Sequence, residues 1–590
     1  MYLKVLACDL DGTLAENGGI ATETWELLHK VKEKGYTLIL VTGRTLNSFG
    51  AAGPFAELFE AIVSEDGATI FYPRNDSVVL PFGRISPDLI TKLEEMNIPF
   101  ERGMAIAATH VPHDEAILDI LRDSGGAATV EYNRGAVMVL PPGATKGTGL
   151  QMVLHELGYS RHNVIACGDA ENDRSLFELA EIAVAVDNAM PEIKKLADVI
   201  LPYSNGEGVR LLMENLYSGK MPDYRKRPER SLILGEVEGG TPVRMDPIDL
   251  LSGNLGIVGS SASGKSWLAG LLAEELLTNG YQICIIDPEG DYRGLRAFPH
   301  TLLLGGPGTS LPPVEDVITI MEYTNNSLII DLSYYDMDKR VDYVGNLLRG
   351  ACNLRARRGR PHWFLLDEVH SFSPAGGGAL TGFLVKNMKE GGFGVVSYQP
   401  SQVAPALLKI LDHWIITRLH QKDDLRVLRK NLNKSLCDDM DWSQLTRQPV
   451  GKAYYCENNT GKKGKQNYRL IEFEVARRIV PHVRHLHKYL RAPLPASKRF
   501  YFHVNSDSGL PETAASLWEF REALEVLPVD TLRYHLERGD FERWLADVLH
   551  DKELSRRLRK LSHRPMDDNA LREALVATVA DRYEELESLI

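Results

Sequence analysis

Apolar and polar positions in the N-terminal part of the chain follow two alternating patterns. Short apolar runs typical of buried strands occur at 4–10, 37–43, 164–169 and 183–187. Between them, segments such as 23–35 repeat apolar residues at the helical period. Strands that alternate with helices in this way predict a parallel sheet covered by helices on both faces.

A second alternating region follows the polar, basic stretch 220–230, which we interpret as a linker. A short strand-rich piece comes first, at 231–255, and strand-like runs then recur up to about residue 420. Residues 458–467 are expected to form an exposed hairpin or loop. The predicted strands of this second region lie at 255–259, 283–291, 327–333, 362–368 and 394–399.

The remaining chain, from about residue 500, has helical periodicity and many charge pairs four residues apart, after one possible strand at 499–504. A chain of 590 residues is long enough for three or four domains. We therefore predict an α/β protein with three domains and one linker. The predicted boundaries are 1–219, 220–230 (the linker), 231–497 and 498–590, the last being mainly helical.

Composition narrows the class of protein. The formal net charge of −13 argues against a broadly basic nucleic-acid binder, although a local basic channel remains compatible with it. The six cysteines are scattered without a CxxC pair, as expected in a reducing compartment and without a zinc site. The N-terminus lacks the pattern of a signal peptide, and no apolar run is long enough to span a membrane. We expect a cytoplasmic protein.

Candidate chemistry first appears where the apolar run 4–10 ends. Asp9 and Asp11 flank Leu10, and Gly12 and Thr13 follow. Ligands bind at the carboxyl ends of parallel strands, and two carboxylates held together there repel unless a cation such as Mg²⁺ relieves them.

Three later segments add to this inventory. Thr42 ends a second strand, Lys146 begins a helix, and Asp169 ends a third strand, with Asp173 four residues further on. A nucleophile, a hydroxyl donor, a lysine and metal ligands together are what metal-assisted phosphoryl transfer through an aspartyl-phosphate requires.

With these four motifs in order, the region resembles the haloacid dehalogenase superfamily, in the group of Cof-type and phosphoglycolate phosphatases. The resemblance implies a Rossmann-like core in which Asp9 is the nucleophile, Asp11 the general acid and base, and Thr42 and Lys146 hold the phosphoryl group. It implies a Mg²⁺ site formed by Asp9, Asp169 and the carbonyl of Asp11, with Asp173 in support. Residues of about 82–140 resemble a small α/β cap. One departure is Glu65–Asp66, where related enzymes often carry Asn.

A second phosphate motif lies at 259–266, between an apolar strand and an amphipathic helix. It fits GxxxxGK[ST], in which backbone N–H groups and the helix N-terminus surround the phosphates of a nucleotide. Its residues are Gly259, Ser260, Ser261, Ala262, Ser263, Gly264, Lys265 and Ser266. Lys265 would contact the β- and γ-phosphates of ATP, and Ser266 would bind Mg²⁺.

Two further strands end in residues suited to ATP hydrolysis. Asp367 and Glu368 end the run 362–368, where Asp367 would hold the Mg²⁺ shell and Glu368 would polarise the attacking water. Gln399 ends the next run and is suited to sensing the γ-phosphate.

Together with 285–292, these motifs resemble the HerA/FtsK group of P-loop ATPases, and HerA-like proteins most of all. The resemblance implies a RecA-like core, a homohexameric ring with DNA in its centre, and an arginine supplied by the neighbouring subunit. Candidates for that arginine are Arg418 and, less directly, Arg426 or Arg429.

Two basic stretches and the tail carry weaker signals. Residues 355–360 and 460–466 would line a pore or contact phosphates, or else lie in solvated loops. The tail is expected to serve packing or oligomerisation, and a third site built from His535, Arg538 and Asp540 has no other support.

The sequence thus predicts a bifunctional enzyme: a Mg²⁺-dependent phosphatase fused to a hexameric, ATP-driven DNA-processing motor. The phosphatase would act on nucleic-acid ends or nucleotides brought near by the ring, and a role in defence against phage fits such a fusion. The alternative is a metabolic phosphatase for a phosphosugar or phosphoglycolate-like molecule, with the ATPase as a scaffold for assembly or regulation. DNA, further copies of the chain and a phosphorylated substrate are the expected partners, and no membrane is expected.

Overall fold

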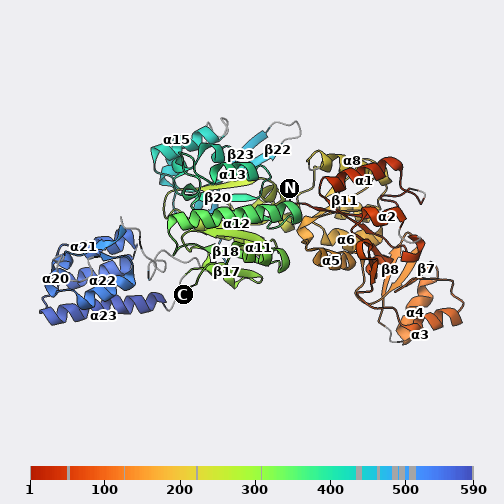
Figure 1. Ribbon diagram of the computed structural model, residues 1–590, viewed down its shortest axis with the longest axis horizontal. Coiled ribbons are helices and arrows are strands. Elements are labelled where there is room, and N and C mark those ends of the chain that lie inside the picture. The colour runs from red at the N-terminus through yellow and green to blue at the C-terminus, as the bar shows by residue number, and fades with distance from the viewer. Residues whose placement is uncertain are drawn as a thin grey trace.

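The computed structural model describes residues 2–16, 18–49, 53–124, 127–220, 223–306, 309–432, 442–460, 466–480, 490, 494, 498–503, 513–549 and 551–587. Three groups of elements follow one another along the chain, from the red and orange segments at the right of Figure 1 to the blue helices at its left. The α/β class predicted from the hydrophobic pattern is confirmed, with separate sheets in the first and second groups.

The first group is an eight-stranded sheet with the order β12-β11-β10-β1-β2-β3-β4-β5. Its strands from β12 to β3 are parallel, and β4 and β5 continue the sheet antiparallel. Helices α1 and α8 pack together above this sheet in Figure 1, and α5 and α6 pack together below it. The strand bounds are β1 Val5–Asp9, β2 Thr37–Val41, β3 Ala61–Ser64, β4 Thr69–Tyr72, β5 Ser77–Val79, β10 Val164–Gly168, β11 Ile182–Ala185 and β12 Val199–Ile200. The helix bounds are α1 Thr22–Glu33, α5 Lys146–Leu157, α6 Arg174–Leu179 and α8 Asn205–Tyr217.

A small second sheet with the order β6-β7-β9-β8 lies where the sequence predicts a cap. Its strands are β6 Glu101–Arg102, β7 Ala107–His110, β8 Thr129–Asn133 and β9 Ala136–Leu140. Helices α3 Pro87–Glu95 and α4 Asp114–Ser124 pack against this sheet around a separate apolar cluster. The cap therefore has its own small core and is attached to the larger domain at its two ends.

The central group is an eleven-stranded sheet with the order β14-β13-β23-β22-β21-β15-β20-β19-β16-β18-β17. The strands from β21 to β17 are parallel, and the other four run antiparallel beside β21. The predicted strands β15 Asn254–Val258, β16 Ile283–Asp287, β18 Ser327–Asp331, β19 Trp363–Leu366 and β20 Phe393–Ser397 are present, and β17 Thr301–Gly305 and β21 His413–Ile416 extend the series. The strand-rich piece contains β13 Leu232–Glu236 and β14 Pro242–Met245, and the hairpin is formed by β22 Lys452–Thr460 and β23 Gln466–Val475.

Alternate residues of the central strands point to opposite faces of the sheet, and each face has its own apolar cover. Ile257 and Ile285 pack with the helix α10 Lys265–Thr278, whereas Cys284 and Ile286 pack with the long helix α12 Met337–Arg358. Helices α11 Val314–Tyr323 and α13 Thr381–Met388 lie with α12 on the second face. On the first face, α10, which carries the second phosphate motif, shares one apolar core with the N-terminal domain.

The C-terminal group is a set of helices, as expected, with a two-stranded ribbon of β24 Phe500–Tyr501 and β25 Thr513–Ala514. Its core combines leucines with Phe520, Phe541 and Trp544. The helices are α19 Leu517–Val526, α20 Val529–Glu537, α21 Asp540–Arg543, α22 Lys552–Ser562 and α23 Asp568–Glu587.

Residues 355–358 form the last turn of α12 and not a solvated loop, and Arg357 there is exposed and pairs with Glu322. That the stretch lines a pore stays a prediction. Arg355 is buried in the last turn of α12, where its Nη1 donates to the Gly391 carbonyl at 2.6 Å. Arg360 is also buried, and its Nη2 donates to the Gly158 carbonyl of the N-terminal domain at 2.7 Å. The other basic stretch, 460–466, lies mostly outside the described residues.

Among all the residues that the structure describes, no helix combines the length and apolar character needed to cross a membrane.

A buried ion pair joins α10 to the chain after the hairpin. Arg478 Nε donates to Glu274 Oε1 at 2.7 Å, and Glu274 also accepts the backbone N–H groups of Ile479 and Val480. We predict that Glu274→Ala destabilises the central domain by roughly 3–5 kcal/mol, because it leaves Arg478 buried without a counter-charge. Hydrogen exchange of α10 in increasing urea measures this loss.

The matched control is Asp423→Ala, which breaks the exposed pair between Asp423 and Arg426 and should change stability by less than about 1 kcal/mol. Equal small effects of the two substitutions would show that the Glu274 pair does not hold the helix.

Candidate functional sites

The first predicted site lies at the carboxyl edge of the N-terminal sheet. Asp9 is the last residue of β1, Thr42 directly follows the neighbouring β2, and Asp169 directly follows β10 on the other side of β1. Lys146 is the first residue of α5, which the side chain of Thr145 caps. Parallel pairing thus brings together residues separated by more than a hundred positions in sequence.

Lys146 is buried between two carboxylates. Its Nζ lies 2.7 Å from Asp9 Oδ1 and 2.7 Å from Asp173 Oδ1. The second oxygen of Asp173 accepts the backbone N–H groups of Asp169 and Ala170. Both Asp173 oxygens are therefore engaged, so this residue positions the lysine and the Asp169 loop, and its predicted support of the Mg²⁺ site stays a prediction.

Three carboxylates meet here around one lysine. Ligand atoms of Asp9, Asp169 and Asp173 all lie within 4.8 Å of one another, and all three residues are buried. Burial raises the pKa of Asp9 well above its ordinary value, and the neighbouring Asp173 and Asp169 raise it further. Burial and Asp173 likewise raise the pKa of Asp169. An additional cation would relieve this repulsion, and clustered carboxylate oxygens are the ligands that Mg²⁺ takes, so the residues present fit that ion.

Gly12 makes this packing possible. It has a φ of +83°, and a Cβ at this position would lie 2.5 Å from Asp169 Oδ2. Glycine is therefore required between Asp11 and Thr13 so that the loop after β1 can approach Asp169 at the end of β10. Thr13 Oγ1 in turn donates to Asp169 Oδ1 at 3.1 Å.

Two arginines belong to this site that sequence reasoning did not single out. Arg44 binds Asp11 through two contacts of 2.7 and 2.5 Å, and its backbone N–H donates to Thr42 Oγ1 at 3.2 Å. Arg134, at the tip of the β8–β9 hairpin of the cap, forms an ion pair with Asp169. The position of Arg44 two residues after Thr42 was a usable signal, whereas Arg134 is brought in only by the fold of the cap.

The Glu65–Asp66 departure has a structural use. Glu65 accepts backbone N–H groups of Met104 at 2.9 Å and Ala105 at 2.8 Å, so it fastens the cap to the core. Asp66 accepts Asn172 Nδ2 at 2.9 Å, and burial raises the pKa of Asp66 to about 6. A carboxyl group thus makes polar contacts at the positions where related enzymes often carry Asn.

The second predicted site lies at the carboxyl edge of the central sheet. The loop from Gly259 to Gly264 joins β15 to α10, and Gly264 adopts a φ of +102° directly before the helix. Lys265 Nζ donates to the Ser260 carbonyl at 2.9 Å, and Ser263 and Thr417 share a hydrogen bond of 2.6 Å. The side chain of Lys265 is therefore folded back over its own loop.

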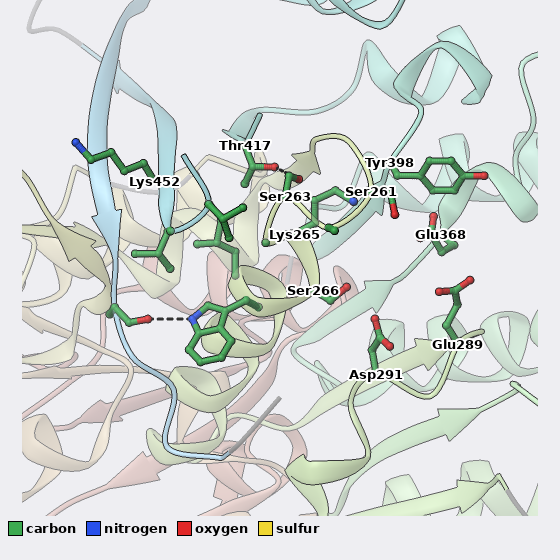
Figure 2. A pocket seen from close by; sticks show the side chains of 18 of the residues that line it. Ser261, Ser263, Lys265, Ser266, Glu289, Asp291, Glu368, Tyr398, Thr417 and Lys452 are labelled. Atoms are coloured by element: carbon green, nitrogen blue, oxygen red, sulfur yellow. Dashed lines mark hydrogen bonds between the residues drawn. The ribbon is translucent and has the colours of Figure 1, made fainter. Parts of the chain in front are cut away.

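A cleft of about 640 Å³ opens beside this loop. The loop contributes Ser261, Ala262, Ser263, Gly264, Lys265 and Ser266 to its lining. Glu289, Asp291 and Glu368 gather near Ser266 in Figure 2, with Tyr398 beside Lys265. Lys498 and Val548 of the C-terminal group also line it.

Four carboxylates act on the one lysine of the loop. Burial lowers the pKa of Lys265, although Glu368, Asp367, Asp291 and Glu289 all act to raise it. Burial and the adjacent Glu368 raise the pKa of Asp367 well above its ordinary value. The charge distribution fits a nucleotide accompanied by a divalent cation, with Glu368 in the wall of the cleft and the adjacent Asp367 buried.

Gln399 and Arg418, the two remaining predicted residues, are not among the residues that line the cleft. Tyr398 lines the cleft where the sequence pointed to its neighbour Gln399. The Arg418 carbonyl accepts the N–H of Ser260 at 2.7 Å, so Arg418 lies next to the loop of its own chain. Arg426 pairs with the exposed Asp423, and Arg429 covers the Trp442 ring at 4.5 Å. The trans-acting arginine stays a prediction.

The tail cluster has a structural explanation. His535 shares its Nδ1 with Asp540 Oδ2 at 2.9 Å and accepts the His503 N–H on Nε2 at 2.9 Å. Both ring nitrogens are thus used inside the helical domain, and Arg538 adds only a 3.4 Å contact to Asp540.

Removing Lys146 tests the electrostatics of the first site. In Lys146→Met the pKa of Asp9 and Asp169 should rise further, so the folded state binds more protons than the unfolded state and loses stability as pH rises. We predict a loss of roughly 3–5 kcal/mol at pH 8 in EDTA and a smaller loss at pH 5. Hydrogen exchange of β1 and β10 at both pH values measures it.

Lys194→Met in the same domain is the control, because Lys194 forms a partly exposed pair with Asp187 at 3.4 Å. A pH-independent loss in Lys146→Met, equal to that of the control, would contradict the charge balance described above.

Known proteins resemble both parts of the chain. The sequence pattern of haloacid dehalogenase-like hydrolases matches residues 6–107 and 107–213, and that of the central domain of helicase HerA matches residues 232–339. "Phosphoglycolate phosphatase 2" of Saccharolobus solfataricus is 31% identical over 220 residues, which cover 36% of this chain and 93% of that protein. "Phosphoglycolate phosphatase" of Nitrosopumilus maritimus is 27% identical over 224 residues, which cover 37% of this chain and 97% of that protein. "Phosphoglycolate phosphatase" of Methanothermobacter thermautotrophicus is 29% identical over 217 residues, which cover 35% of this chain and 96% of that protein. The chain therefore belongs, through its N-terminal domain, to the haloacid dehalogenase-like hydrolases, and it carries a HerA central domain behind that hydrolase domain.

Proposed function

We propose that the chain is a bifunctional hydrolase, with a Mg²⁺-dependent phosphomonoesterase in its N-terminal domain and an ATPase in its central domain. The observation that carries the first half is the position of Lys146 between Asp9 and Asp173, with Asp169 beside them. The observation that carries the second half is a loop of the GxxxxGK[ST] type facing Glu368 across a cleft.

In the phosphatase, Asp9 attacks the phosphorus atom and the bond to the leaving oxygen breaks. Asp11 gives its proton to that oxygen and later takes one from the water that hydrolyses the aspartyl-phosphate. Lys146 and Thr42 hold the phosphoryl oxygens. Asp9, Asp169 and the Asp11 carbonyl would hold Mg²⁺, which supplies charge neutralisation when bound.

In the ATPase, the N–H groups of the loop and Lys265 bind the phosphates. Ser266 and Asp367 are placed to hold the accompanying Mg²⁺, and Glu368 orients the attacking water. Tyr398 lies closer to this cleft than Gln399 does, so we include it among the residues that sense the nucleotide.

The substrate of the phosphatase is proposed to be a small phosphorylated metabolite. Its relatives are named phosphoglycolate phosphatases. A cleft of about 650 Å³ between core and cap opens onto Asp9 and Asp11, and Phe100, Glu101 and His110 line its cap side. This volume also accommodates a larger phosphosugar, so both belong in a substrate screen.

The second activity is proposed to drive a ring of ATPase subunits on DNA, as the HerA-like domain implies. One observation favours the alternative, in which the ATPase serves assembly or regulation: the two sites occupy the carboxyl edges of two sheets whose amino edges face each other. Within one chain, DNA in the ATPase is therefore not delivered to the phosphatase. The role in phage defence rests on the type of domain fusion alone.

Separate loss of the two activities tests the bifunctional proposal. We predict that Asp9→Asn abolishes release of phosphate from phosphoglycolate and sugar phosphates while ATP hydrolysis stays within about twofold of wild type. Lys265→Ala and Glu368→Gln should do the reverse, with a loss of at least about 10²-fold in ATP hydrolysis. Phosphate release with each substrate measures both, and joint loss in every variant would refute two independent sites.

ATP hydrolysis measured with and without DNA distinguishes a DNA motor from an assembly scaffold. If the ring moves on DNA, duplex DNA should stimulate ATP hydrolysis severalfold at low salt, and the stimulation should decline as salt rises because phosphate contacts release counterions. ATP hydrolysis that does not respond to DNA, with no DNA retained by the protein at low salt, would favour the scaffold.

A further inference from the structure

The phosphatase domain and the ATPase domain meet through the amino ends of their parallel strands. Tyr2, Asn163 and Glu181 precede β1, β10 and β11 of the first sheet, whereas Tyr281 and His362 precede β16 and β19 of the second. These residues contact one another, and the N-terminus of the chain lies at this junction in Figure 1.

Glu181 is the centre of the junction. Its Oε1 accepts the hydroxyl groups of Tyr2 at 3.0 Å and Tyr281 at 2.9 Å, and its Oε2 lies 2.7 Å from His162 Nδ1. All of these side chains are buried. Burial opposes the charge on Glu181, but His162, the Tyr281 hydroxyl and Arg230 hold the pKa of this carboxyl below its ordinary value. The carboxylate of Glu181 thus binds residues that precede a strand in each domain, Tyr2 before β1 and Tyr281 before β16.

His162 continues from Glu181 to the end of the phosphate-binding helix. Its Nε2 lies 3.0 Å from the carbonyl of Asn279, the residue that caps α10. A carboxylate and a carbonyl only accept hydrogen bonds, so each ring nitrogen of His162 faces an acceptor, one in each domain. Arg161 adds a contact of 3.3 Å to the same carbonyl.

The rest of the interface is equally specific. Asn163 Nδ2 donates to the carbonyls of Tyr2 and Gly359, and Arg360 donates to the Gly158 carbonyl. The apolar core of the phosphatase continues without a break into the core under α10, including Leu272 and Leu276. The end of the basic stretch, residues 358–360, is therefore part of this joint.

We propose that the phosphatase domain is a structural part of the ATPase, which fixes the C-terminal end of α10 and thereby sets how well the loop at its other end binds nucleotide. Lys265 begins α10 and Asn279 caps it, and a helix of 14 residues is about 21 Å long. Because a helix transmits displacement along its axis, release of the Asn279 end alters the position of the Lys265 loop. The consequence for nucleotide binding rests on the proposed ATPase function, but the fixing of the helix does not.

Glu181→Gln in the full-length chain tests the proposal. The substitution keeps the shape of the side chain but leaves His162 without a carboxylate. The NH₂ group of the glutamine replaces an oxygen that now contacts the hydroxyl groups of Tyr2 and Tyr281 or the ring of His162. In nucleotide-free protein, native-state hydrogen exchange of residues 270–280 should become at least tenfold faster, while exchange in the cap and in α15 Lys422–Asn431 stays within about twofold. The Kd of a non-hydrolysable ATP analogue should rise at least tenfold.

Glu178→Gln is the matched control, because Glu178 pairs with Arg174 on the exposed side of α6 at 3.0 Å and should change neither quantity. Where Glu181→Gln yields too little folded protein, Tyr2→Phe removes a single hydroxyl donor and should give a two- to fivefold effect in the same direction.

Unchanged exchange in 270–280 for both variants overturns the proposal. Faster exchange by the same factor throughout the chain also overturns it, since the junction would then stabilise the protein generally without positioning α10. Faster exchange confined to 270–280 supports the proposal even if wild type binds no ATP analogue, an outcome that would refute only the proposed ATPase.

Discussion

Each of the two candidate sites contains more buried carboxylates than buried cations, and the rest of the interpretation depends on this imbalance. At the first site Lys146 lies between Asp9 and Asp173, with Asp169 beside them, and at the second the buried Asp367 and Asp291 act on the buried Lys265. Buried like charges are costly unless protons or cations compensate them. The fold tolerates this cost where a divalent cation and a phosphoryl group are to be bound.

Parallel sheet topology explains how both sites arise. Side chains that follow adjacent parallel strands meet at one edge of a sheet, so a short motif after each strand is enough to assemble a site. The same topology leaves the amino edges free for another purpose, and in this chain they join the two domains around Glu181. The two candidate sites thus lie on the far sides of the two sheets, and the contacts between the domains lie between the sheets.

The residues at the carboxyl edges could be predicted from sequence because each follows an apolar run directly. Asp9, Thr42, Asp169 and the loop before Lys265 lie where the hydrophobic pattern placed them. Tyr398, the neighbour of the predicted Gln399, also lines the cleft but could not be singled out. Side chains alternate between faces in an extended chain, and the pattern does not show which one points inward. Arg134 and Arg360 could not be predicted, because their partners are distant in sequence and depend on how the cap and the domains pack.

Counting magnesium ions tests the central claim most directly. Calorimetric titration of Mg²⁺ into the nucleotide-free, full-length protein should show one saturable site per chain. That site should be lost in Asp169→Asn and retained in Lys265→Ala, because the first set of carboxylates is complete without nucleotide and the second is not. Absence of saturable binding, or binding that survives Asp169→Asn, would contradict the account.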